Sequence, residues 1–475
     1  MRPPMRPTVF GPAGALAAAL LLSACAGFSP DGGLSGVNAI TAPALAGNVV
    51  ALRTPADAEQ ARARVRALLA GPLSADRAVQ IALINNRDLQ AAYNALGLSE
   101  AAMVQAGLPP NPTFSVEHIA GGGVVEIESR IVANLLALAT LPARADIAAE
   151  RFRQAQLQAA SETLRAASEA RRAFYRAVAA QSLVAFLAQA RDTAEAGAQL
   201  GKRLGETGAI GKLDQARTQV IYAELVGQLA TARLRASSER ERLVRALGLW
   251  GDDLDFRLPA QLPPLPARVR PLAGVEVEAV RRRVDLQMAR IEVDLLARSY
   301  GLSGATRFLN LLDVAGVSKQ TRQNGETTRE RGFELAFQVP LFDFGDVKVR
   351  QAEQAYLQAV NRLVAKAVNV RSQAREAYRG YRAAYDIARH YRREVLPLRQ
   401  IISDETLLRY NAMQIDVFTL LNETRQRIGS ATAAIEAERE FWLAETNLAA
   451  ALLGGHAEPS AIAASTTASE RAGAH

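Results

Sequence analysis

The most regular pattern of apolar positions lies in the second half of the chain, between residues 352 and 395. Alanine, tyrosine and a few larger aliphatic residues recur there about every 3.6 residues, the spacing of one face of a straight α-helix. Because most of these side chains are small, neighbouring helices can approach one another closely. The pattern predicts a long, closely packed helix, and an extended coiled coil fits it equally well. The positions are Ala352, Tyr356, Ala359, Leu363, Ala367, Val370, Ala374, Ala377, Tyr381, Ala384, Ala388, Tyr391 and Val395.

A second long helix is predicted in the first half of the chain. From Ala143 to Leu258 there is no proline, and the stretch is rich in Ala, Leu, Gln, Glu and Arg, which favour helices. One helix over residues 143–204 would span about 93 Å at ~1.5 Å per residue. Glycines between Gly201 and Gly211 predict the turn of a long helical hairpin.

Short stretches that alternate with a period of two precede each long helix. Residues 125–131 and 333–339 place apolar and polar side chains on opposite faces, as β-strands do. Their predicted partner strands alternate less clearly and lie at residues 112–118 and 306–314. The connections are predicted to be a glycine-rich turn at residues 119–123 and a long polar loop at residues 315–332.

These strands have the pattern of an outer-membrane barrel wall, apolar outside and polar inside, although soluble β-hairpins alternate in the same way. Four strands cannot close a barrel, because the smallest membrane barrels have about eight. An open edge in lipid would leave unpaired backbone groups. The pattern therefore predicts that several copies share one barrel, most simply as a cyclic homo-oligomer.

The chain contains two copies of one unit. Asp88-Leu89-Gln90 returns as Asp285-Leu286-Gln287, and three further short matches recur at nearly the same offset. We predict a first repeat over residues 72–256, each repeat holding a helix, two strands and a long helical hairpin. A Pro-rich linker follows over residues 257–270, then the second repeat over 271–455 and a disordered tail over 456–475. The further matches are Pro72-Leu73 with Pro271-Leu272, Leu141-Pro142 with Val339-Pro340, and Leu157-Gln158-Ala159 with Leu357-Gln358-Ala359.

The first residues have the organisation of a signal peptide, predicted over residues 1–24. Two arginines precede the apolar run 13–22, which is too short to cross a membrane as a helix, and no later run is long enough. The sequence Leu22-Ser23-Ala24-Cys25 resembles the lipobox of bacterial lipoproteins. Cys25 is therefore the predicted lipid attachment site at the start of an N-terminal segment, residues 25–71. A signal peptide that merely contains a cysteine near its end is the alternative.

Composition argues against several classes of function. The chain has 56 Lys+Arg and 48 Asp+Glu, a net charge of +8, but both signs are mixed along the sequence, which does not indicate nucleic-acid binding. One cysteine and four scattered histidines argue against a zinc or histidine metal cluster. Glu126 and Glu128 lie two apart on one strand face, and we interpret them as polar residues of a barrel lumen, not as a catalytic pair.

The segment from Val339 to Gly345, Val-Pro-Leu-Phe-Asp-Phe-Gly, joins the last predicted strand to the alanine-rich helix. This segment and the repeat organisation resemble the TolC-like outer membrane factors over about residues 72–455. The resemblance implies a mainly α-helical fold with a membrane β part, in which three copies form a 12-stranded β-barrel continued by a long α-helical barrel. It also implies passive conduction without catalysis or cofactor, with a periplasmic adaptor and an inner-membrane pump as partners. Lipidated members resemble the chain from Cys25 onward, so we expect an outer-membrane protein, anchored by lipid, that extends into the periplasm.

The resemblance also implies that the two hairpin turns form the periplasmic tip, where the adaptor docks and the duct opens. Asp214 and Tyr410 match positions that join neighbouring hairpins by a hydrogen bond in this family. Met413 occupies a position where the family has glycine, which predicts a turn without a positive φ. The family's acidic gate is not expected here, because Thr419 and Asn422 stand at its positions. The remaining matching positions are Gly208, Leu213 and Arg409.

Other classes of protein stay open from the sequence. A periplasmic lipoprotein scaffold or adaptor without a membrane barrel would also contain long helical hairpins, although an adaptor has only one. An envelope hydrolase would need a nucleophile and base that the sequence does not display. The duct's substrate is equally open among metals, drugs, solvents and polypeptides, and the turn from Tyr410 to Met413 resembles metal-efflux members.

Overall fold

The computed structural model describes residues 27–45, 49–271 and 273–454, which form two compact units. The first unit contains residues 94–158 and 286–365 together with the start of the described chain, and the second contains residues 37–93, 159–285 and the chain from 366 onward. The predicted signal peptide, Cys25 and the predicted tail at 456–475 lie outside the described residues. None of the described helices is long and apolar enough to cross a membrane.

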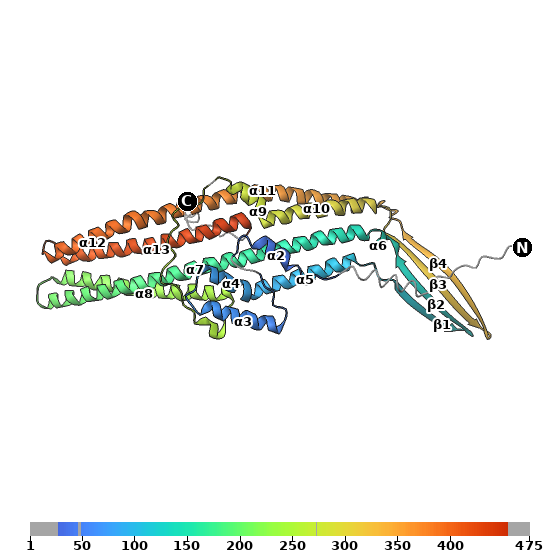
Figure 1. Cartoon of the computed structure of the whole chain (residues 1–475), viewed down its shortest axis with the longest axis horizontal. Coiled ribbons are helices and arrows are strands. Elements are labelled where there is room, and N and C mark those ends of the chain that lie inside the picture. Colours follow the sequence, from blue (N-terminus) through green and yellow to red (C-terminus); the bar gives the residue numbers. More distant parts are fainter. Residues whose placement is uncertain (1–26, 46–48, 272, 455–475) are drawn as a thin grey trace. The chain divides into compact units, whose positions relative to one another are not determined.

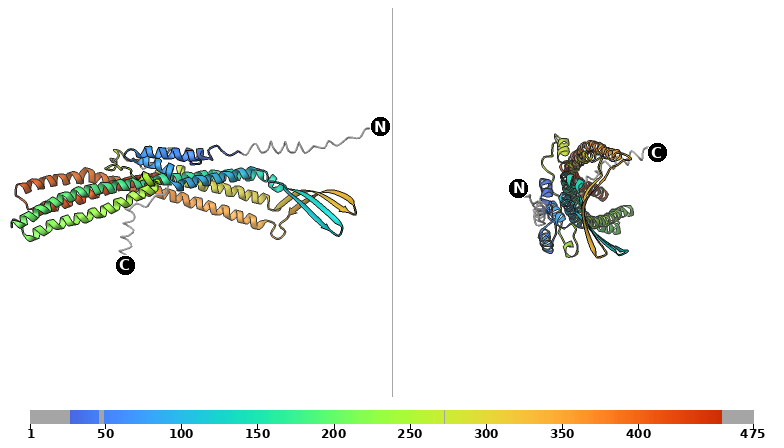
Figure 2. Two further views of the ribbon diagram at one scale, coloured as in Figure 1. Left: turned by 90° about the horizontal axis from the view of Figure 1, so that it is seen from below. Right: turned by 90° about the vertical axis from the view of Figure 1, so that its right-hand side faces the viewer.

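The first unit holds one four-stranded antiparallel sheet in the order β1-β2-β3-β4. Figures 1 and 2 show its two hairpins side by side, β1 with β2 and β3 with β4, although residues 135–310 separate them in sequence. Both hairpins extend from the same ends of the helices that precede and follow them (Figure 1). The strands are β1 Thr113–Gly121, β2 Val124–Asn134, β3 Leu311–Gln323 and β4 Glu326–Gln338. The adjoining helices are α5 Arg87–Gly107, α6 Leu135–Ala139, α10 Val284–Ala305 and the beginnings of α7 Leu141–Glu206 and α11 Asp346–His390.

The prediction of a long polar loop at residues 315–332 is wrong, because these residues extend β3 and β4 to 13 residues each. A two-residue turn joins them at Asn324 and Gly325, whose φ angles of 50° and 86° suit a tight hairpin. The loop was predicted because most side chains of this stretch are polar. In the sheet, strand pairing satisfies the backbone, so polar residues are tolerated wherever both faces are exposed in the chain.

The segment that carries the family resemblance is a tight connection between β4 and α11. Asp343 Oδ1 accepts a hydrogen bond from the Gly345 N–H at 3.1 Å, and Phe344 and Gly345 both have positive φ, 48° and 74°. A Cβ at Gly345 would lie 2.1 Å from the carbonyl oxygen of Arg307. Glycine is therefore required at this position by the close approach of two backbones as well as by φ.

The second unit is built from two long helical hairpins, which lie side by side in Figures 1 and 2. The predicted helix over residues 143–204 is confirmed and is slightly longer, since α7 spans Leu141–Glu206. The predicted stripe to residue 395 is continuous in α11 as far as His390 and then passes through a single π-helical turn, Tyr391–Val395. Pro397, which has no N–H to donate, follows that turn directly and accounts for the change in backbone pairing. The hairpin helices are α7, α8 Lys212–Leu247, α11 Asp346–His390, α12 Leu396–Asn411 and α13 Val417–Leu453, and the shorter elements are α2 Leu34–Thr41, α3 Pro55–Leu69, α4 Ala75–Asn85, the 3₁₀ turn Gly251–Leu254 and α9 Val275–Arg282.

Tyrosines of α11 that neighbour the predicted stripe bind the Pro-rich segment to the second unit. Tyr378 and Tyr385 donate hydrogen bonds to the carbonyl oxygens of Arg270 and Pro266, both at 3.1 Å. Trp442 on α13 donates its indole N–H to the Pro263 carbonyl, also at 3.1 Å. The rings pack in one aromatic cluster around the fully buried Phe441 while their polar atoms satisfy carbonyls that proline-rich backbone cannot pair in a ladder.

Candidate channel wall and hairpin tips

Cross-strand partners in the sheet place apolar residues together on one face. The pairing of Phe114 with Ile131, of Ile131 with Gly316 and of Gly316 with Phe333 forms one row across all four strands. These large side chains are exposed in the single chain, and Phe333 is 85% accessible. An exposed row of aromatic and aliphatic groups of this kind is suited to contact with lipid.

The opposite face of the sheet is charged and predominantly acidic. Glu117, Glu128, Lys319 and Glu330 form one row across the four strands. Seven acidic residues share this face with two cations, and both cations are paired. Arg130 contacts Glu128 at 2.9 Å and Glu334 at 3.4 Å, and Lys319 contacts Glu126 at 3.1 Å. The acidic residues are Glu117, Glu126, Glu128, Asp313, Glu326, Glu330 and Glu334.

The sheet is therefore a two-faced wall, apolar on one side and charged on the other. A wall of this kind separates lipid from an aqueous lumen. Glu126 and Glu128 both point to the charged face and both have a cationic partner, so their spacing agrees with the interpretation as lumen residues. Among the described residues, no group of three or more His, Cys, Asp or Glu side chains is arranged to hold a metal ion.

The first hairpin tip ends α7 with a Schellman turn. The Ala209 N–H donates to the Leu204 carbonyl at 2.8 Å, and the Gly208 N–H donates to Gly205 at 3.1 Å. Gly208 has a φ of 76°, the left-handed conformation that such turns require and that glycine adopts without strain.

The second tip has the same backbone, and the prediction that Met413 would form a turn without a positive φ is wrong. Met413 has a φ of 59°. Its N–H donates to the Tyr410 carbonyl, and the Gln414 N–H donates to the Arg409 carbonyl, both at 2.9 Å. These two bonds end the helix as in the first tip, so hydrogen bonding to the last carbonyls outweighs the steric preference of the methionine backbone.

Arg217 joins the returning helices of the two hairpins, a contact that was not predicted from the sequence. Its guanidinium lies 3.1 Å from the Asp214 carboxylate and stacks 4.5 Å from the ring centre of Phe418 on α13. Further along, Arg425 contacts Glu224 at 3.3 Å between the same helices. The spacing of Arg217 three residues after Asp214 was a readable signal for the ion pair, whereas Phe418 comes close only through tertiary packing.

The two returning helices begin with different caps. The N-cap of α8 is Gly211, which makes no side-chain hydrogen bond, and Asp214 lies in the first turn paired with Arg217. In the second tip Asp416 caps α13, and its Oδ1 accepts from the Thr419 N–H at 2.7 Å. Hydrogen bonds from Thr419, side chain and backbone, hold the pKa of Asp416 below its usual value.

The remaining predicted tip residues lie on the surface of the same two turns. Leu213 and Met413 are 63% and 93% exposed, Asn422 is exposed, and Arg409 pairs with Glu405 at 3.0 Å. Tyr410 is half-buried, and within the described part of the chain its hydroxyl has no hydrogen bond to Asp214. The bond between Asp214 and Tyr410 of neighbouring hairpins stays a prediction.

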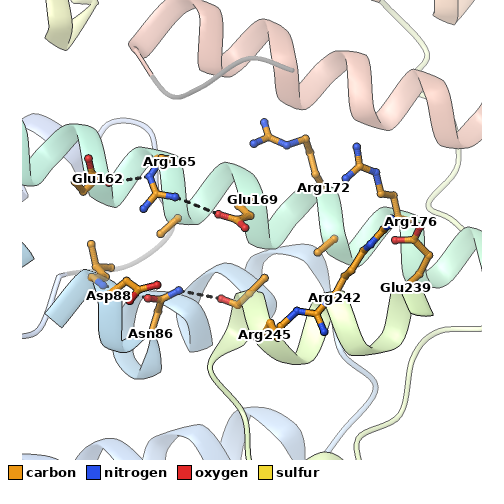
Figure 3. A pocket seen from close by; sticks show the side chains of 14 residues that line it. Asn86, Asp88, Glu162, Arg165, Glu169, Arg172, Arg176, Glu239, Arg242 and Arg245 are labelled. Carbon is orange, nitrogen blue, oxygen red and sulfur yellow. Dashed lines mark hydrogen bonds and ion pairs between the residues drawn. The ribbon is translucent and has the colours of Figure 1, made fainter. Parts of the chain in front are cut away.

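A charged pocket of about 500 Å³ lies in the second unit where the start of α5 meets α7 and α8 (Figure 3). Arg165 contacts Glu162 at 2.7 Å and Glu169 at 3.4 Å along α7, and Arg242 contacts Glu239 at 2.8 Å along α8. Arg172 donates to Asn447 of α13 at 3.3 Å. The lining of this pocket has five arginines and four acidic residues, and it contains no Ser, Thr, Cys, Lys or His side chain.

The second half of the chain, residues 276–452, matches the sequence model of the family described as outer membrane efflux protein. The cobalt-zinc-cadmium resistance protein CzcC of Cupriavidus metallidurans is 26% identical over 307 residues, which cover 60% of this chain and 68% of that protein.

Solved structures share the fold. CusC superposes with a TM-score of 0.67 at 14% identity, covering 83% of this chain and 92% of that one. The CmeC outer membrane channel of Campylobacter jejuni superposes with a TM-score of 0.65 at 14% identity, covering 90% and 94%. The resemblance expected from the sequence is confirmed, and with it the function of an outer-membrane efflux channel. Over residues 276–452 the chain is therefore similar in sequence to the outer membrane efflux proteins, and its fold is that of the solved outer membrane channels.

Proposed function

We propose that three copies of this chain form a continuous duct in which β4 of each copy pairs with β1 of the next. The observation that carries this proposal is the two-faced sheet with two free edges. In the described chain β1 pairs only with β2, and β4 only with β3. An unpaired edge exposed to lipid costs several kcal/mol for each backbone group left without a partner. Four strands in each of three copies make a closed barrel of twelve.

Lipid attachment at Cys25 would hold the start of the mature chain at the same membrane. Two acyl chains bind a bilayer firmly where one binds only marginally. The anchor and the barrel then act at the same membrane, and the helical hairpins extend into the periplasm.

The two hairpin tips are the proposed docking surface for the periplasmic adaptor and the proposed gate. Leu213 and Met413 present exposed apolar side chains on neighbouring turns, and such side chains suit helix-tip contacts with a partner. Conduction from adaptor and inner-membrane pump to the exterior would be passive, because the tips and the wall need only open and offer a hydrated path.

Divalent metal cations are the proposed substrates. The relative CzcC is named for resistance to cobalt, zinc and cadmium. The acidic excess on the charged face of the sheet would favour cations in a lumen lined by three such sheets.

The experiment is to purify the full chain in detergent, weigh the particles by mass photometry and record single-channel conductance in planar bilayers. The proposal expects particles of three chains and ion conductance that prefers cations. A stable monomer without conductance would contradict the duct and favour the lipoprotein scaffold. An anion-selective trimer would keep the duct and contradict the metal-cation substrate.

A further inference from the structure

Three arginines interrupt the apolar face of the sheet near the turn between β3 and β4. Strand pairing places Arg322 opposite Thr327, Arg329 opposite Gln320, and Arg331 opposite Ser318, all on the face that carries Phe333 and Ile131. All three arginines are exposed. No strand residue on this face is acidic, and none of the three arginines makes an ion pair with another described residue.

The cations on the opposite face of the sheet, unlike these arginines, have carboxylate partners. There, Lys319 on β3 and Arg130 on the neighbouring β2 both form ion pairs with glutamates. The chain therefore provides carboxylate partners for its lumen cations and none for the cations of its apolar face. Charged groups on the lipid face of a barrel are destabilising in the bilayer middle and tolerated near its surface, so these arginines belong at the headgroup level.

We propose that Arg322, Arg329 and Arg331 bind the phosphate groups of lipids in the outer leaflet. The proposal rests on the proposed membrane barrel, because only then does this face meet lipid. The turn end of the sheet points away from the helices, so the arginines lie at the outer surface if the helices extend into the periplasm (Figure 1). Arg329 lies between the other two: Arg331 is two residues away on the same strand and Arg322 is diagonal to it on β3, so the backbone of Arg329 is within about 8 Å of each of them. Guanidinium groups at this spacing bind phosphate oxygens in pairs.

The test uses the purified full chain and, as the probe, lipid A with both phosphates or the same lipid with its phosphates removed. Native mass spectrometry measures the lipid bound to each particle. We expect the phosphorylated lipid to bind at least about tenfold more tightly than the dephosphorylated one, and a variant with Arg322→Gln, Arg329→Gln and Arg331→Gln to lose that preference. The triple arginine-to-lysine variant should keep most of it, because the charge remains.

The matched control is Lys319→Gln, which removes one cation from the adjacent row on the opposite face. It should bind phosphorylated lipid as the wild type does, whereas the single Arg329→Gln should bind it more weakly. Equal binding of both lipids, or equal weakening by Lys319→Gln and Arg329→Gln, would overturn the proposal. Mass photometry and conductance are recorded on the same samples, so a conducting trimer without lipid preference refutes this inference alone, and a monomer without conductance refutes the duct.

Discussion

The two hairpin tips have the same backbone and different sequences. Both end their outgoing helix with the same pair of hydrogen bonds, and both place one residue in the left-handed region. In the first tip that residue is Gly208, which adopts this conformation freely, and in the second it is Met413, for which it costs about 1–2 kcal/mol. The comparison teaches that the turn is determined by the helix ends and not by the residue at its corner.

At the start of the returning helices, the second tip has the more favourable residue. The first tip has a relaxed corner and an N-cap, Gly211, without a side-chain hydrogen bond. The second has a strained corner and a helix capped by Asp416. The second tip therefore keeps a fully exposed methionine side chain at its corner, and the capped helix that follows compensates part of the strain.

The largest expected effect is on conductance and tests whether the tips hold one another closed. If Asp214 accepts a hydrogen bond from Tyr410 of a neighbouring hairpin, Asp214→Ala and Tyr410→Phe should each raise single-channel conductance several-fold. The double variant should add little, since both changes remove one interaction. Planar-bilayer recordings of the three variants measure this.

Arg217→Gln is the control for that pair, because Arg217 is the partner that Asp214 contacts within its own chain. If Asp214 acts only by holding Arg217 on Phe418, Arg217→Gln will match Asp214→Ala and Tyr410→Phe will be silent. Wild-type conductance in all three variants would mean that these contacts do not hold the gate.

The next largest effect is expected on the local stability of the first tip when methionine, the residue found at position 413 of the second tip, replaces Gly208. Gly208→Met should lower the free energy of local opening of the first tip by about 1–2 kcal/mol, because methionine takes on a positive φ there. Hydrogen–deuterium exchange of the amides around residues 204–215 measures the change, and the second tip serves as the internal reference.

The reverse substitution should give a smaller gain. Met413→Gly should raise the opening free energy of the second tip by roughly 0.5–1 kcal/mol, since relief of strain is partly offset by the greater freedom of glycine in the unfolded chain. Slower exchange at residues 409–419 is the expected result. Exchange that becomes faster would show that Met413 makes stabilising contacts that outweigh its backbone strain.

The smallest effect depends on pH and distinguishes the two returning helices. Because the pKa of Asp416 is lowered in the folded chain, its capping contribution is present above the carboxyl's usual pKa near 4 and is lost as pH falls through the lower folded value. Amide protection at the start of α13 should therefore decline on acidification in the wild type. In Asp416→Asn, which keeps an acceptor without a titratable proton, the decline should disappear, and α8, which lacks a side-chain cap, should show none.

Elements whose cause is local could be predicted from the sequence. The absence of proline and the spacing of small residues specified α7 and most of α11, and strict alternation identified β2 and the second half of β4. The segment from Val339 to Gly345 carried the family resemblance, and the structure explains its glycine, which has a positive φ and lies against the Arg307 carbonyl.

Tertiary structure alone decided the features that depend on distant partners. The polar composition of residues 315–332 predicts a loop. They form strands because β3 pairs with β2 from the other half of the chain, which satisfies their backbone hydrogen bonds. Met413 takes a positive φ because carbonyls at the end of α12 need donors, a demand that outweighs its own preference. Local alternation predicted that each strand has an apolar and a polar face, but the register that aligns these faces across all four strands comes from pairing. The contact of Arg217 with Phe418 likewise depends on residues far apart along the chain.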